Sequence, residues 1–131
     1  MKRVLVLYDD KKTINLLKCD LSPLGLEVKI LEAENVERAL SILEEGADVA
    51  FIDRYLHDED VGVNFIKENT NKFKNVNFYL HSSRNDEEAT NEVVKSGGKG
   101  FINKRDSYPI DYARTLGFSE EKLKSLGYKE P

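Results

Sequence analysis

Residues 4–10 read Val-Leu-Val-Leu-Tyr-Asp-Asp, an apolar run that leads directly into the paired acids Asp9 and Asp10. Continuous apolar runs of this length are typical of strands buried on both faces, as in parallel sheets. In open parallel sheets, ligands bind outside the carboxyl ends of the strands. The stretch therefore predicts a central strand that delivers two carboxylates to a ligand-binding rim.

Three later apolar runs also end at a residue with reactive or ligating chemistry. Asp53 follows Val-Ala-Phe-Ile, and Lys104 follows Gly-Phe-Ile-Asn. Between them, Ser82 follows Val-Asn-Phe-Tyr-Leu-His. Each residue alone is also explained by a solvated turn or a helix cap. Their coincidence at four strand ends favours a shared site for a divalent cation, which prefers oxygen ligands, and a phosphoryl group.

Strand-like segments alternate with helical patterns along the chain. The strands begin near residues 4, 27, 49, 76 and 100, and each interval leaves room for a strand and a crossover helix. Apolar periodicity and capping residues predict helices over about 11–21, 35–46, 63–73 and 85–97. The alternating segment at 27–31 predicts an edge strand. Five βα units around one core are the economical interpretation.

The segment at about 107–128 predicts a divided C-terminal helix. Pro109 suits a first helical turn, and Gly117 ends the short apolar stripe that follows. Ser119 is a good N-cap for a second short helix, which Gly127 ends.

Composition narrows the classes of function. At 131 residues the chain has the length of a single domain, 1–131. A net charge of −4 without a basic cluster argues against a nucleic-acid partner, and the apolar runs are too short for membrane insertion. The single Cys19 excludes an internal disulfide, and we expect it to be a buried thiol in a reducing compartment. Residues 1–3 lead straight into a strand without a signal-peptide pattern, so we expect a cytoplasmic location.

Over about residues 2–105 the chain resembles the receiver domain of two-component response regulators, the CheY-like domains. The matching motifs are VLVLYDD, VAFID, FYLHSS and GGKGFINK, and the intervals between their functional positions agree closely with those of the family. The resemblance implies a doubly wound, flavodoxin-like five-stranded parallel sheet in three αβα layers. The segment after residue 105 is the divergent part.

The resemblance also implies phosphorylation of Asp53 by a histidine kinase or a histidine phosphotransfer protein, with Mg²⁺ as the cofactor. Asp10 and Asp53 would ligate Mg²⁺ directly, Asp9 would do so through water, and the backbone carbonyl of Tyr55 would add a ligand.

Three further residues are assigned roles by the same resemblance. Lys104 would pair with the phosphoryl oxygens, and Ser82 would donate its hydroxyl to one of them. Phe101 stands where the family has an aromatic residue that swings inward when the hydroxyl moves, although a plain core aromatic explains it equally well. Lys104 and Mg²⁺ would offset the charge that builds on the phosphoryl group.

The sequence departs from the family pattern at three places. Arg105 replaces the usual proline after the lysine, so we expect a trans peptide bond there. The loop at 54–62 is longer than usual and holds acids at 58–60, which we interpret as a solvated turn. The usual last helix is interrupted at Gly117.

These observations support a stand-alone receiver that signals by contact with an unknown downstream protein or by phosphorelay. Such a receiver can form a homodimer. We expect it not to be an enzyme toward external substrates. The alternative is a pseudo-receiver, a phosphorylation-independent interaction scaffold, which Arg105 and the acidic loop favour. A haloacid-dehalogenase-type phosphatase needs a second aspartate where Tyr55 stands. A serine hydrolase using Ser82 would need a nucleophile-elbow motif, which the sequence lacks.

Overall fold

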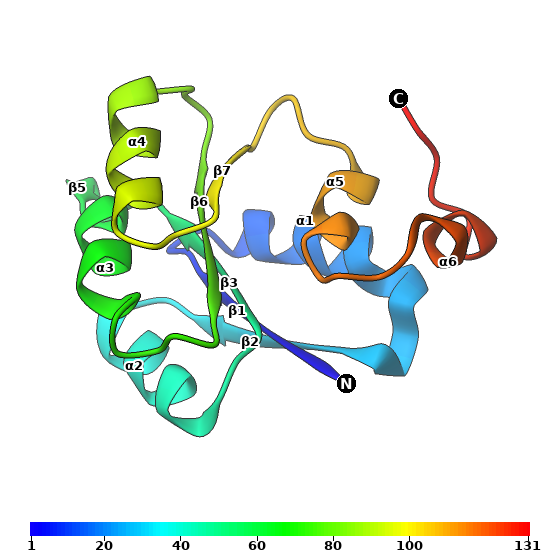
Figure 1. Cartoon of the computed structure of the whole chain (residues 1–131), viewed down its shortest axis with the longest axis horizontal. Coiled ribbons are helices and arrows are strands. Elements are labelled where there is room, and N and C mark those ends of the chain that lie inside the picture. The colour runs from blue at the N-terminus through cyan, green and yellow to red at the C-terminus, as the bar shows by residue number, and fades with distance from the viewer.

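A five-stranded parallel sheet forms the middle layer of the molecule, in the order β2-β1-β3-β6-β7 (Figure 1). The computed structural model describes residues 1–131. The strands are β1 (Lys2–Leu7), β2 (Val28–Ala33), β3 (Val49–Asp53), β6 (Asn77–Ser82) and β7 (Gly100–Asn103). This order is that of flavodoxin-like doubly wound folds, so the predicted fold class is confirmed.

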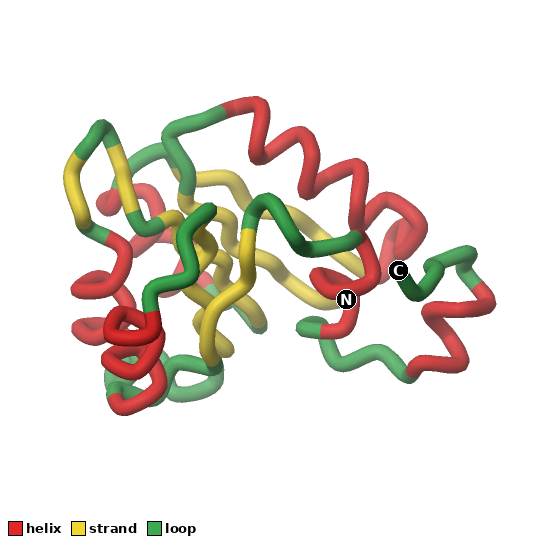
Figure 2. Tube along the Cα trace, turned by 90° about the horizontal axis from the view of Figure 1, so that it is seen from above, coloured by secondary structure: helices red, strands yellow, loops and turns green.

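Helices cover both faces of the sheet (Figures 1 and 2). The helices are α1 (Lys11–Leu21), α2 (Val36–Glu45), α3 (Gly62–Asn69), α4 (Glu87–Lys95), α5 (Pro109–Arg114) and α6 (Glu120–Ser125), with a short 3₁₀ segment η1 (Ser22–Glu27). One apolar core lies between the sheet and α2, α3 and α4, and the other between the sheet and α1, α5 and α6. No helix combines the length and the apolar character needed to cross a bilayer.

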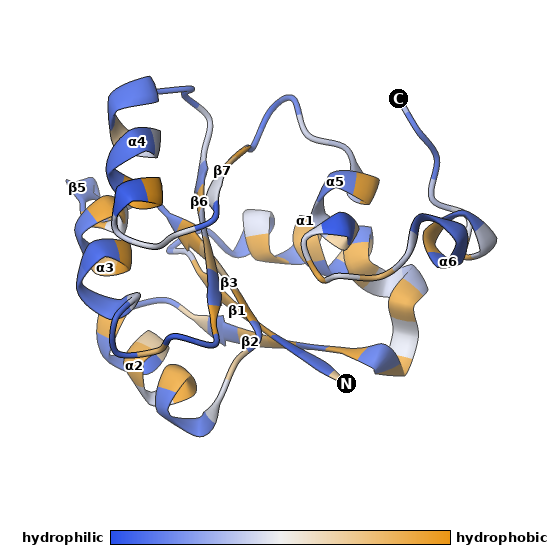
Figure 3. Ribbon diagram, viewed as in Figure 1, coloured by the Kyte–Doolittle hydropathy of each residue, from blue (hydrophilic) through white to orange (hydrophobic).

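The side-chain alternation of β1 explains the two cores. Val4 and Val6 belong to the core under α1, whereas Leu5 and Leu7 belong to the core under α2. All four side chains are fully buried, because β1 lies between β2 and β3 and has a helical layer on each face. Figure 3 shows the resulting contrast between apolar central strands and a largely hydrophilic α4.

Helix ends follow the expected capping chemistry. The side chain of Asn35 accepts a hydrogen bond from the backbone N–H of Arg38 at 2.8 Å, and that of Ser119 accepts one from Lys122 at 3.2 Å. The C-terminal segment is divided as predicted, with α5 and α6 separated by Gly117 at a φ of +86°. Leu123 of α6 is fully buried, so α6 is an integral part of the layer that contains α1 and α5.

Two predictions about the helices were wrong. The third helix ends at Asn69 rather than near residue 73, because the Asn-Thr-Asn run that begins there has low helix propensity. The side-chain amide of Asn69 instead donates to the carbonyl of Phe65 at 2.8 Å. Cys19 is exposed, not buried, because Leu17 and Leu21 define the inner face of α1 and Cys19 lies on the opposite side.

The loop after Asp53 forms a small hairpin where a simple solvated turn was expected. Strands β4 (Tyr55–Leu56) and β5 (Glu59–Asp60) pair antiparallel. His57 and Asp58 connect them with φ values of 50° and 66°, as in a type I′ turn. Three acids in this stretch concealed the hairpin, since the short strands lack an apolar alternation.

Gly62 follows the hairpin and lies against the backbone at the end of β3. We predict that Gly62→Ala destabilises the protein by about 1–3 kcal/mol. A Cβ on Gly62 would lie 2.3 Å from the carbonyl oxygen of Asp53 and 2.6 Å from the Cα of Arg54, and neither backbone atom can move freely. Urea unfolding followed by circular dichroism measures the change. Asn64→Ala, at an exposed position of the same helix, is the matched control. Equal unfolding midpoints for the two variants would contradict the prediction.

Candidate functional site

The carboxyl ends of β1, β3, β6 and β7 bring four of the predicted site residues to one edge of the sheet. The reversal of strand order falls between β1 and β3, where such sheets open a binding crevice. Asp53 is the last residue of β3 and is only 6% exposed. The Nζ atom of Lys104, just past β7, lies 3.0 Å from Oδ1 of Asp53. The predicted meeting of an acid from one strand and a lysine from another is therefore present.

The Asp53 carboxyl group is under opposing electrostatic influences. Burial raises its pKa, and this is the largest effect. The ammonium of Lys104 lowers the pKa, as does the weak hydrogen bond at 3.4 Å that the backbone N–H of Tyr55 donates to Oδ1, while the nearby charge of Asp9 raises it. The net result is a raised pKa, so a cation placed here stabilises the ionised form that a nucleophilic carboxylate needs.

The acid pair after β1 is divided between two tasks. Oδ2 of Asp9 accepts a hydrogen bond at 2.7 Å from the backbone N–H of His57, which docks the hairpin on the rim. Asp10 is the N-cap of α1 and accepts hydrogen bonds at 2.9 Å from the backbone of Lys12 and the hydroxyl of Thr13. These bonds lower the pKa of Asp10.

The predicted metal ligands have suitable chemistry but are not gathered around one point. Carboxylate oxygens are the donors that Mg²⁺ prefers, and the charge of Asp9 is close enough to Asp53 to raise the pKa of Asp53. However, no cluster of three or more His, Cys, Asp or Glu side chains has a spacing that could hold a metal ion. Asp10, a predicted direct ligand, is engaged as the cap of α1.

Ser82 and Phe101 lie on neighbouring strands close to this edge. Ser82 ends β6 and is buried, and its Oγ accepts a hydrogen bond at 3.3 Å from the backbone N–H of Arg84. Phe101 is half-buried and packs against the core under α2, α3 and α4. Tyr55, whose carbonyl was a predicted ligand, is 43% exposed at the base of the hairpin.

The segment after Lys104 holds its shape without proline. All peptide bonds are trans, as expected for Arg105. The side-chain oxygen of Asn103 accepts hydrogen bonds from the backbone N–H groups of Arg105 at 2.7 Å and Asp106 at 3.1 Å. The backbone N–H of Lys104 donates to the carbonyl of Ser82 at 2.9 Å and so continues the β6–β7 pairing by one residue. This short turn fixes the point from which the lysine side chain starts.

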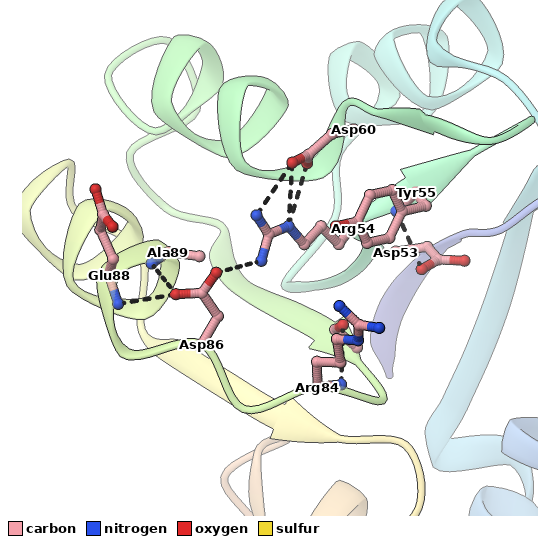
Figure 4. A network of polar contacts seen from close by, with 9 residues as sticks. Asp53, Arg54, Tyr55, Asp60, Arg84, Asp86, Glu88 and Ala89 are labelled. Carbon is pink, nitrogen blue, oxygen red and sulfur yellow. Dashed lines mark hydrogen bonds and ion pairs between the residues drawn. The ribbon is translucent and has the colours of Figure 1, made fainter.

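Arg54 is a residue that the sequence analysis did not single out. Its guanidinium contacts Asp60 of β5 at 3.1 Å and Asp86, the N-cap of α4, at 2.8 Å (Figure 4). The side chain is only 16% exposed, and the two acids raise its pKa. Arg54 therefore ties the hairpin and the start of α4 to the end of β3. A basic residue directly after the buried acid was the only available signal, and its partners are not adjacent in sequence.

Solved structures share this fold over almost the whole chain. A two-component response regulator from Clostridium difficile matches with a TM-score of 0.75 and 23% identity, covering 98% of this chain and 100% of that one. A CheY-like receiver domain protein from Methanospirillum hungatei matches with a TM-score of 0.73 and 21% identity over 96% of both chains. No protein-family model and no curated protein sequence matches.

A third neighbour carries ligands at its site. The response regulator from Burkholderia pseudomallei was solved with a phosphorylated aspartic acid, a calcium ion and citrate, and it matches with a TM-score of 0.76 and 15% identity over 95% of this chain and 72% of that one. At these identities the likeness is one of fold. The chain has the flavodoxin-like fold of response regulator receiver domains, and the predicted resemblance is confirmed at that level.

We predict that Asp53→Asn stabilises the protein at neutral pH by an amount on the order of 1 kcal/mol. Between the usual pKa of an aspartate and the raised pKa of Asp53, the folded state binds more protons than the unfolded state. Stability of the parent protein therefore falls as pH rises through this window. The asparagine side chain does not ionise, so the variant does not lose stability in this way. The difference in stability between the variant and the parent should therefore shrink as pH falls below the window. Thermal unfolding across pH 3–8 measures the difference, and a pH-independent difference would contradict the assignment.

We predict that Arg54→Ala loosens the hairpin and the first turn of α4, at a cost of about 1 kcal/mol. The variant leaves Asp60 and Asp86 without their shared cation, although both remain in contact with water. Hydrogen exchange should accelerate at the amides of the hairpin and of the first turn of α4. Arg84→Ala is the control, since Arg84 makes no ion pair. Unchanged exchange in Arg54→Ala would show that the ion pairs are not what holds the hairpin.

Proposed function

We propose that this protein is a phosphorylation-dependent signalling receiver whose phosphoryl acceptor is Asp53. The observation that carries the proposal is the buried Asp53 carboxylate at the switch point of a receiver fold, with the Lys104 ammonium 3.0 Å away. A buried acid held beside one lysine at a ligand-binding edge is costly for stability, which favours a functional reason for its presence.

In this proposal an oxygen of the Asp53 carboxylate attacks phosphorus. The bond between phosphorus and the donor group breaks, and the donor atom keeps the electron pair. With a histidine kinase or a histidine phosphotransfer protein as the donor, that atom is an imidazole nitrogen. Lys104, already paired with Asp53, would neutralise charge on the transferred group, and the Ser82 hydroxyl would donate to it.

Asp9, Asp10 and Asp53 are the residues that would hold Mg²⁺, with the Tyr55 carbonyl as a further ligand. When bound, the ion offsets negative charge on the phosphoryl group. Each oxygen of the Asp10 carboxylate accepts one hydrogen bond at the start of α1 and keeps a second lone pair, so Asp10 would ligate the ion while it caps the helix.

The product signals through a change of charge and hydrogen bonding at the strand ends. An aspartyl phosphate at Asp53 adds negative charge at the end of β3, beside the strand that ends at Ser82. Tyr55 follows Asp53 by two positions in the sequence. The partner that reads this change is a protein, either a downstream target or the next member of a phosphorelay. No reaction on an external substrate is needed for this role.

A phosphorylation-independent scaffold is the second candidate. The scattered carboxylates and the exposed acids of the hairpin favour it, because a scaffold requires neither a gathered metal site nor an accessible acceptor. Mg²⁺ affinity discriminates between the receiver and the scaffold, since only a receiver that undergoes phosphorylation needs the ion.

We predict that acetyl phosphate with Mg²⁺ adds one phosphoryl group, which intact-mass measurement detects. Asp53→Asn should abolish the addition, and chelation of Mg²⁺ should prevent it. Asp58→Asn is the matched control, because Asp58 is an exposed acid in the turn of the neighbouring hairpin. If the folded parent protein gains no mass while a known receiver does so in the same buffer, the scaffold is the correct function.

A further inference from the structure

A buried chain of three polar rings runs beneath the candidate site. The Oη atom of Tyr8 lies 2.5 Å from Nδ1 of His81, and Nε2 of His81 lies 2.7 Å from Oη of Tyr112. Tyr8 follows β1, His81 lies on β6 and Tyr112 lies on α5. All three residues are at most 4% exposed. The chain therefore joins two strand ends to the helix that packs against α1.

Hydrogen-bond satisfaction gives the chain a direction. Tyr8 is fully buried, and His81 is the sole partner of its hydroxyl, so the hydroxyl donates to Nδ1. Burial and the nearby Lys104 lower the pKa of His81 to about 3, which keeps the ring neutral. A neutral ring that accepts at Nδ1 donates from Nε2, so His81 donates to Tyr112. Tyr112 lines a cavity of about 230 Å³ between α1 and α5.

The same tyrosine ring underlies the lysine of the candidate site. Nζ of Lys104 lies 5.4 Å from the centre of the Tyr8 ring, within the range of a cation–π interaction, and 3.0 Å from Asp53. The Tyr8 ring thus supports the ammonium on one side while the carboxylate attracts it on the other. The hydrogen bond to His81 anchors the hydroxyl end of the ring.

We propose that Tyr8 is a positioning residue that aims Lys104 at Asp53, and that His81 and Tyr112 hold it in place. The inference rests on the proposed function, because it assigns the chain a part in phosphoryl transfer. It also explains how Lys104 is directed although Arg105 stands in place of a proline. The Asn103 turn fixes the backbone of Lys104, and the Tyr8 ring fixes the far end of its side chain.

Packing alone does not account for three polar groups at these positions. Phenylalanine or leucine would fill the same space without any hydroxyl or imidazole to satisfy. Phe51, an apolar ring, already packs beside both His81 and Tyr112, with ring centres 6.3 Å and 5.8 Å away. A hydrogen-bonded chain adds a fixed orientation that apolar rings do not supply.

The first test compares phosphorylation rates with acetyl phosphate and Mg²⁺ in two backgrounds. In the parent protein, Tyr8→Leu removes the ring under Lys104 and should slow phosphorylation by roughly tenfold, since small misplacements of a catalytic group are costly. Tyr8→Phe keeps the ring but removes its hydrogen bond to His81, and it should have a smaller effect. In a Lys104→Met background, Tyr8→Leu should cause no further loss. An equal loss in both backgrounds would overturn the proposal, because Tyr8 would then act without Lys104.

Two matched variants guard against a general packing effect. Tyr79→Phe removes a hydroxyl from the tyrosine of β6, which packs on the same core, and its rate should equal that of the parent. Tyr112→Phe breaks the chain at its far end, beside the cavity, and should slow phosphorylation even if Tyr8→Leu does not fold. A normal rate in Tyr112→Phe would show that the chain does not position the lysine.

A second test needs no phosphorylation and separates this proposal from the proposed function. Thermal midpoints are measured for Tyr8→Leu, which removes the ring, for Lys104→Met and for the double variant. Contact between the two residues predicts a departure from additivity of about 2 °C or more. Additive shifts would overturn the positioning role. If the parent protein takes up no phosphoryl group, the proposed function fails, while this cycle still shows whether Tyr8 supports Lys104.

Discussion

The contact between Asp53 and Lys104 is the constraint around which the edge of the sheet is arranged. A carboxylate this deeply buried requires a cation, and Lys104 supplies it across two strand boundaries. The lysine reaches Asp53 because its own backbone extends the β6–β7 pairing and because Asn103 closes the following turn. The strand register, the Asn103 turn and the opposite charges therefore all determine the contact between Nζ of Lys104 and Oδ1 of Asp53.

Two routes lead from this pair to opposite layers of the molecule. Alternate residues of β6 face opposite sides of the sheet, so His81 points toward α5, and its neighbour Leu80 packs in the core under α4. On the α4 side, Phe101 packs against that core, and Arg54 joins the end of β3 to the cap of α4. A change of charge at Asp53 is thus connected to both helical layers by polar contacts as well as by packing.

The sequence predicted features that depend on periodicity or on strand direction. The apolar runs around Asp53 and Lys104 were sufficient to place both residues at one edge, because parallel strands all end on the same side. Capping residues such as Asn35 and Ser119 predicted helix starts for equally local reasons. Fold class and the position of the site follow from such short-range signals.

Features that depend on long-range side-chain partners were not predictable. His81 meets Tyr8 across 73 positions, and Arg54 meets Asp86 across 32. Nothing in the local sequence identifies those partners. Asp10 caps α1 for a local reason, but whether the same carboxylate also binds an ion depends on ligands from other strands, which periodicity does not determine.

The departures from the receiver pattern are compensated locally, and this argues against treating them as signs of lost function. The acidic hairpin is not a free cluster of negative charge, since Asp60 is paired with Arg54. The backbone of His57 binds Asp9, so the hairpin also fixes an acid of the candidate site. Asn103 supplies the turn that a proline would otherwise fix, and the Lys104 side chain still reaches Asp53. A carboxylate this deeply buried is costly for stability without a partner, and Lys104 supplies that partner although the loop and the turn both depart from the receiver pattern.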